Sequence, residues 1–288
     1  MTVQPEQNKL ICGFEEEWQD FRKRNDTFFQ RFPNLLEALN GAFFLPTNFT
    51  DRDDMFVFTY SRVCVEDFFE ILLLCGNAYG YAAEKLIRGL YERAVTLRYL
   101  NEHPKEIDDF MDFHLVSRRK LMFACRETMG SDMFPDAEVE SIENEYQQVK
   151  NKFEVTACEA CGTKRPGHHW SKLDFVSMAK KTNLGQLIVP GYYLPLAQAH
   201  ATPSSLFSRL TANEAGVLSF NTELQRRPAD KALRSSFVIM LNVLRVQLDR
   251  FNPPGLKEKI DRCDQDYFEI YGKVDDGKSA AQTSQPAC

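Results

Sequence analysis

Residues that could carry chemistry gather in one stretch of the chain, between Cys158 and His200. This stretch contains the one closely spaced cysteine pair of the sequence, three of its five histidines and one of its two tryptophans. It opens with CEACGTKRPGHHW and closes with YYLPLAQAHATPSS. Thiolates and imidazole nitrogens bind zinc, and an imidazole can also exchange protons near neutral pH. The stretch therefore predicts a site for metal binding or for acid–base chemistry.

The cysteine pair has the spacing of a zinc knuckle. Cys158 and Cys161 form C-x-x-C followed by glycine, and RPGHH comes shortly afterwards. Tetrahedral zinc needs four ligands, so we predict one structural zinc ion bound by Cys158 and Cys161 with help from His168 or His169. Two alternatives stay open. The cysteines could be free thiols on a surface loop, or a redox pair, although a thioredoxin-like context requires a preceding strand that the sequence does not indicate.

A second set of candidate residues combines a charged helix edge with a histidine. Arg88 and Glu92 are four residues apart beside an apolar helical stripe, and His200 follows a segment rich in proline and tyrosine. The pair could be an exposed i,i+4 contact, or a buried ion pair that lines a pocket. His200 could be a packing residue or a functional one. As catalytic candidates we name His200, Arg88 and Glu92.

Arg98 and His103 match the short R-x4-H pattern of helical ribonucleases of the HEPN superfamily. With so many arginines in the chain, one such match is expected by chance. Pro104 also ends the helix directly after His103, so the two side chains need not share a face. The pattern supports only a secondary hypothesis.

Composition restricts the class of protein. The chain has 288 residues, a net charge of −6 and 23 phenylalanines, enough for a sizeable core. The acidic balance gives no indication of nucleic-acid binding. The sequence has no apolar run of membrane-spanning length and no secretory leader, so we expect a cytoplasmic protein with reduced cysteines.

Apolar residues recur at helical spacing along most of the chain, and no convincing alternating pattern occurs, which predicts an all-α, multi-helix bundle of roughly eight to ten helices with little strand. Pro33, Pro104 and Pro228 are placed at helix starts, and Ser171 with Asp174 resembles a capping pair. We expect a single domain over residues 10–272, with the Cys/His insert as a loop over 158–169. Polar tails are predicted at 1–9 and 273–288. The strongest helices are expected at 10–32, 51–75, 81–102, 104–129, 136–152 and 228–251.

Three short patterns resemble the bacterial domain-of-unknown-function family DUF5677. They are RGLYERAVTLRYL, HHWSKLDFVSMAKK and YYLPLAQAHATPSS, and the likeness extends over roughly residues 55–250. The resemblance implies an all-helical fold but no reaction. It also draws attention to five residues as a binding site: Arg88, Glu92, Trp170, Tyr193 and His200.

Two functional hypotheses follow. The first is a binding or regulatory module, in a stress or phage-defence setting, with its pocket around those five residues. The alternative is a hydrolase or ribonuclease that uses a histidine–arginine pair. An enzyme requires the histidine, arginine and glutamate to converge in an open cleft, whereas a module should have them paired with one another. The sequence is compatible with a homo-oligomer and identifies no partner.

Overall fold

The computed structural model describes residues 13–43, 49, 51–158, 160–213, 216–221 and 223–272. The tails predicted at 1–9 and 273–288 lie outside these residues. The chain divides into two compact units. Unit 1 combines the residues up to Leu97 with those from Gln186 onward, and unit 2 comprises Arg98–Gly185. The single domain predicted over 10–272 spans both units.

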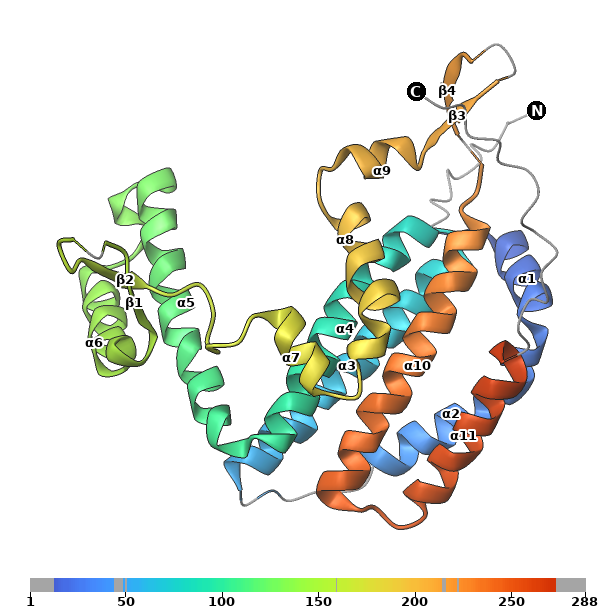
Figure 1. Ribbon diagram of the computed structural model, residues 1–288, viewed down its shortest axis with the longest axis horizontal. Helices are drawn as coiled ribbons and strands as arrows, with labels where there is room; N and C mark the ends of the chain where they lie inside the picture. Colours follow the sequence, from blue (N-terminus) through green and yellow to red (C-terminus); the bar gives the residue numbers. More distant parts are fainter. Residues whose placement is uncertain are drawn as a thin grey trace, which may run out of the picture. The chain divides into compact units, whose positions relative to one another are not determined.

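The described residues form eleven α-helices and a few short elements (Figure 1). In unit 1 the helices are α1 (Glu15–Arg24), α2 (Asp26–Phe43), α3 (Arg52–Gly76), most of α4 (Gly80–Glu102), α8 (Leu194–Ala199), α9 (Pro203–Phe207), α10 (Arg226–Phe251) and α11 (Leu256–Tyr271). Unit 2 contains α5 (Ile107–Met129), α6 (Asp136–Phe153), α7 (Phe175–Lys181) and the 3-10 turns η1 (Pro104–Glu106) and η2 (Ser131–Met133). The predicted multi-helix fold is confirmed.

Strand content is low, as predicted, and the described residues form two small antiparallel hairpins. β1 (Glu154–Thr156) pairs with β2 (Lys164–Pro166), and β3 (Leu210–Ala212) pairs with β4 (Leu218–Phe220). Each strand has three residues, which is too short for an alternating apolar pattern to stand out in the sequence.

The core of unit 1 is built on the contact between α3 and α10. Apolar residues occupy most faces of α3, so this helix can be buried on several sides. Within the contact, Gln247 Nε2 donates a hydrogen bond of 2.7 Å to Ser61 Oγ, and Ser61 in turn donates to the carbonyl of Val57. Both polar side chains are fully buried. The hydrogen bond therefore joins two core helices at one fixed position.

Two helix boundaries differ from the predicted ones. The first helix breaks at Asn25, where the side-chain amide donates to the carbonyl of Phe21. Pro33, predicted to open a helix, lies inside α2 instead. At the other boundary, Asp174 alone caps α7 by accepting from the Ser177 amide, while Ser171 accepts from Leu173. Side-chain-to-backbone hydrogen bonds of this kind compete with helix and are difficult to place from sequence.

Unit 2 has its own small core between α5 and α6. It consists of Val116, Tyr146, Val149 and Phe153, with Trp170 packed at its margin. Arg119 lies over the Tyr146 ring at 4.4 Å and also forms an ion pair with Glu143. These contacts explain how the polar helix α6 is fixed to α5.

In the ranges that the structure describes, none of the helices is both long and apolar enough to cross a membrane.

Candidate ligand site on α4, α8 and α10

One short segment of unit 1 packs on α4, and we call residues 187–200 the wall segment. It begins at Leu187 and continues through the π-helical turn η4 (Val189–Tyr193) and α8 to His200. Gly191 makes the close approach possible, because a Cβ atom there would lie 2.6 Å from Cγ of the buried Tyr91 on α4. π-Helical turns are uncommon and are frequent at functional sites.

Arg88 connects α4 to the middle and to the C-terminal end of this segment. Its Nε donates to Glu92 Oε1 at 2.8 Å, its Nη1 lies 2.5 Å from His200 Nε2, and its guanidinium carbon lies 5.0 Å from the centre of the Tyr192 ring. An arginine can only donate, so Nε2 accepts and the imidazole proton is on Nδ1. We call Arg88, Glu92, Tyr192 and His200 the Arg88 cluster.

The Arg88–Glu92 pair is half-buried rather than enclosed. The side chain of Arg88 is 21% exposed and that of Glu92 is 39% exposed. Water therefore reaches the carboxylate, and the pair lies between the two alternatives of a surface contact and a buried ion pair.

A second polar contact fixes the C-terminal part of the wall segment. The buried Gln198 donates to Ser208 Oγ at 3.1 Å and accepts from Arg209 Nη1 at 3.0 Å. Arg209 lies over the Tyr81 ring at 4.4 Å, and the Tyr81 hydroxyl donates to the carbonyl of Ser208. The segment is thus attached to the first turn of α4 as well as to its middle.

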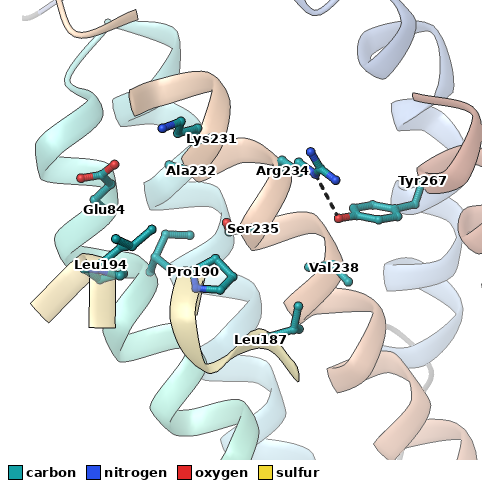
Figure 2. Close-up of a pocket in the computed structure, with 12 residues that line it drawn as sticks. Glu84, Leu187, Pro190, Leu194, Lys231, Ala232, Arg234, Ser235, Val238 and Tyr267 are labelled. Atoms are coloured by element: carbon teal, nitrogen blue, oxygen red, sulfur yellow. Dashed lines mark hydrogen bonds between the residues drawn. The ribbon is translucent and has the colours of Figure 1, made fainter. Parts of the chain in front are cut away.

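A pocket of about 340 Å³ lies between α4, the wall segment, α10 and α11 (Figure 2). Most of its lining is apolar, and its polar side chains are Glu84, Lys231, Arg234, Ser235 and Tyr267. Figure 2 shows Lys231, Ala232, Arg234, Ser235 and Val238 following one another along α10, with Glu84 on α4. The apolar members are Ile87, Leu187, Pro190, Leu194, Pro195, Ala232 and Val238.

The charges around the pocket are of both signs. Burial raises the pKa of Glu84, while Lys231 and then Arg209 act in the opposite direction. The Arg234 Nε donates a long hydrogen bond of 3.5 Å to the Tyr267 hydroxyl, and its guanidinium lies 5.5 Å from the Tyr271 ring centre. Lys231 and Arg234 are both exposed. The pocket thus has an apolar interior and two cations at its margin.

The structure brings together some of the predicted site residues. Arg88, Glu92 and His200 are in contact, and Tyr193 packs edge-on against Tyr192. Trp170 belongs to unit 2, where it packs on Phe110 and Tyr99. None of the five predicted binding residues lines the pocket.

Sequence reasoning missed Tyr192, although the adjacent Tyr193 was selected. It also missed the α10 side of the pocket. The signal available was Lys231 and Arg234, three residues apart on a strong apolar helix, which places both on one helix face.

The second predicted site, the cysteine pair, lies at the tip of the β1–β2 hairpin. The Ala157 amide donates to the Thr163 carbonyl at 2.7 Å, and Gly162 takes a left-handed conformation with φ of 66°. Cys158 and Cys161 are exposed and reduced. Hydrogen bonds from Thr163 and then from Cys158 lower the pKa of Cys161 to about 7. A strand does precede the pair, contrary to expectation, but it is a three-residue strand of a small hairpin.

The histidines expected to complete the zinc site lie at the other end of this hairpin. The Gly167 amide donates to the Phe153 carbonyl, which extends the pairing beyond Pro166, and His168 follows. His168 Nε2 lies 2.8 Å from Arg165 Nη1. Within the described part of the chain, no three His, Cys, Asp or Glu residues are grouped to hold a metal ion. Zinc binding stays a prediction.

The two residues of the R-x4-H pattern, Arg98 and His103, contact different neighbours. Arg98 Nε donates to Glu102 at 2.6 Å. The His103 ring stacks on Tyr99 with centres 4.2 Å apart, and its Nδ1 contacts the Tyr99 carbonyl at 2.9 Å. Each side chain thus has its own partner on the same helix.

The fold and site define a mainly helical protein whose wall segment packs on α4. Residues 54–217, more than half of the chain, match the family described as "Family of unknown function (DUF5677)". The chain belongs to this family, which confirms the resemblance found in the sequence. The matched region includes the Arg88 cluster and the cysteine hairpin and ends before α10. No curated protein and no solved structure matches the chain.

Proposed function

We propose that this protein is a binding or regulatory module whose ligand is small, largely apolar and anionic. The observation that carries the proposal is the pocket between α4, the wall segment and α10. Its volume of about 340 Å³ falls in the range of small-molecule sites, which are mostly apolar with a few polar groups that fix orientation. Lys231 and Arg234 at its margin are suited to a carboxylate, sulfonate or phosphate group.

In this proposal the Arg88 cluster positions the pocket wall and does not contact the ligand. Arg88 holds Tyr192 and His200, and the same segment supplies Pro190 and Leu194 to the pocket. Loss of the cluster should therefore weaken binding indirectly. The sequence-based hypothesis instead assigned ligand contact to the cluster itself. Substitutions in the Arg88 cluster would test that hypothesis directly, whereas the present proposal is tested by substitutions in the pocket lining.

The mutual pairing of Arg88, Glu92 and His200 supports a module over a hydrolase or ribonuclease. A general base needs a free lone pair directed at the substrate. His200 Nε2 faces the Arg88 guanidinium instead. The enzyme alternative receives no specific support from this arrangement.

The test uses two fluorescent probes that share an anilinonaphthalene ring system. 8-Anilinonaphthalene-1-sulfonate carries an anionic group, and N-phenyl-1-naphthylamine does not. Lys231→Gln and Arg234→Gln should each weaken sulfonate binding by roughly tenfold, the loss expected for one charge-assisted hydrogen bond. Both variants should bind the neutral probe as the unmodified protein does.

Arg227→Gln is the matched control, since it removes the same charge from the same helix at a residue outside the pocket lining. Val238→Trp, designed to fill the pocket, should abolish binding of both probes. The proposal fails if Val238→Trp binds both probes normally, or if Arg227→Gln weakens sulfonate binding as much as the two pocket variants.

A further inference from the structure

The tip of the β1–β2 hairpin offers a metal ion two sulfur ligands. Cys158 and Cys161 flank a turn that is closed by hydrogen bonds from the Ala157 and Cys158 amides to the Thr163 carbonyl. The side chains of the two cysteines are hydrogen-bonded to each other. Two thiolates held close together on a tight turn are half of a tetrahedral zinc site.

The same hairpin keeps the chain's nearby histidines away from the sulfurs. Thr163 lies across from Ala157 at the tip, while Gly167 pairs with Phe153 at the base. His168 therefore follows strand β2 and the paired Gly167. At about 3.3 Å per residue the four steps from Thr163 to Gly167 cover roughly 13 Å, so the backbone of both histidines begins well away from the two sulfurs. Unless the hairpin opens, His168 and His169 are excluded as ligands for this pair.

The surroundings of the tip allow another molecule to approach. Both cysteines are exposed, and a Cβ added at Gly162 would meet no atom within 4 Å. Lys164, which follows Thr163 in the adjoining strand and lies 3.9 Å from Glu154, carries positive charge that partly offsets the double negative charge of a zinc ion with four thiolates. The tip is thus open, rich in sulfur and electrostatically suited to such a centre.

We propose that Cys158 and Cys161 of two copies of this chain together bind one zinc ion. A two-fold axis through the metal makes the two hairpin tips equivalent, as in most homodimers. The four thiolates complete the tetrahedron and leave no open position for water, so the ion is structural and joins the copies. The proposal is independent of the pocket in unit 1.

The test is a titration of full-length, untagged, reduced protein with zinc, in which metal content and molar mass are measured together. We expect half an equivalent of zinc per chain, with conversion of monomer to dimer that a chelator reverses. Cobalt in place of zinc should give the absorption of a four-thiolate tetrahedral site. Cys158→Ser with Cys161→Ser should lose both the metal and the dimer, whereas Cys125→Ser, a half-buried cysteine in the same unit, should retain them.

His168→Ala with His169→Ala separates this arrangement from a zinc site within one chain. The double variant should bind zinc and dimerise as the unmodified chain does. One zinc per monomeric chain, lost in the histidine variant, would overturn the proposal in favour of an intrachain site. Reduced protein that takes up no zinc at the pair, or a pair that only forms a disulfide when oxidised, would also overturn it.

Discussion

The Nη1 atom of Arg88 lies 2.5 Å from Nε2 of His200, across 112 residues of sequence. This contact joins the middle of α4 to the residue that ends α8. Because the same guanidinium also pairs with Glu92 and lies over Tyr192, one cation contacts a residue of its own helix and two residues of the wall segment.

We expect Arg88 and Glu92 to be coupled by only about 0.5–1 kcal/mol in a double-mutant cycle. The exposed carboxylate of Glu92 keeps most of its hydration, so little is gained when it pairs. Chemical denaturation of the two alanine variants and their combination measures the coupling. Arg98 and Glu102 provide a comparison pair, with the same spacing and side-chain exposures of 19% and 33%. Coupling of several kcal/mol for Arg88 and Glu92 would show instead that they are enclosed in solution.

Gly191→Ala should destabilise the protein by roughly 1–3 kcal/mol, because the added methyl group overlaps the Tyr91 ring. Tyr91 is fully buried and has no room to move away. The wall segment should therefore shift outward and probe binding should weaken. Thermal unfolding and probe titration of the same variant measure the two effects.

Gly89→Ala, two residues before Tyr91 on α4, is the control. Its added methyl group meets only the end of the flexible Arg93 side chain, and alanine favours helix by about 0.5–1 kcal/mol over glycine. This variant should be neutral or more stable. Equal losses in both variants would mean that the Tyr91 contact is not the cause.

Sequence reasoning located the helices better than it located the site. The apolar repeats of α3, α4 and α10 predict these helices because burial of one face determines both pattern and fold. Arg88 and His200 could be selected by residue type and by the family resemblance. Their contact could not be predicted, because it depends on the path of the wall segment over Gly191. The cysteine spacing predicted a turn but not the hairpin, whose length separates the cysteines from the histidines.

Ser61→Ala should cost about 1–3 kcal/mol, because it leaves the buried amide of Gln247 without its acceptor. The Gln247 Oε1 atom is already buried without a partner. Adding Gln247→Met removes both amide atoms at similar volume, so most of the loss should be recovered. Urea denaturation of the two single variants and the double variant measures this. Additive losses would indicate that the two side chains act independently.

Glu84→Gln should stabilise the protein at neutral pH but not in acid. Burial raises the folded-state pKa of Glu84 above its ordinary value of 4.5, so the fold favours the protonated form. Stability from this group is therefore complete below pH 4.5 and falls as pH rises through the raised pKa. Glutamine mimics the protonated form. The difference in melting temperature between variant and parent should grow from acid to neutral pH, and a difference independent of pH would contradict the assignment.

The π-helical turn at Val189–Tyr193 makes the site depend on the number of residues in the chain as well as on their identities. A π turn is an α-helical turn that contains one additional residue. Deletion of any one of these five residues would restore ordinary helix, and each residue of helix corresponds to a rotation of about 100°. His200 would then be turned away from Arg88 with its own sequence neighbours unchanged. In homologous chains, the length of this segment should therefore predict the Arg88–His200 contact as well as the presence of the histidine does.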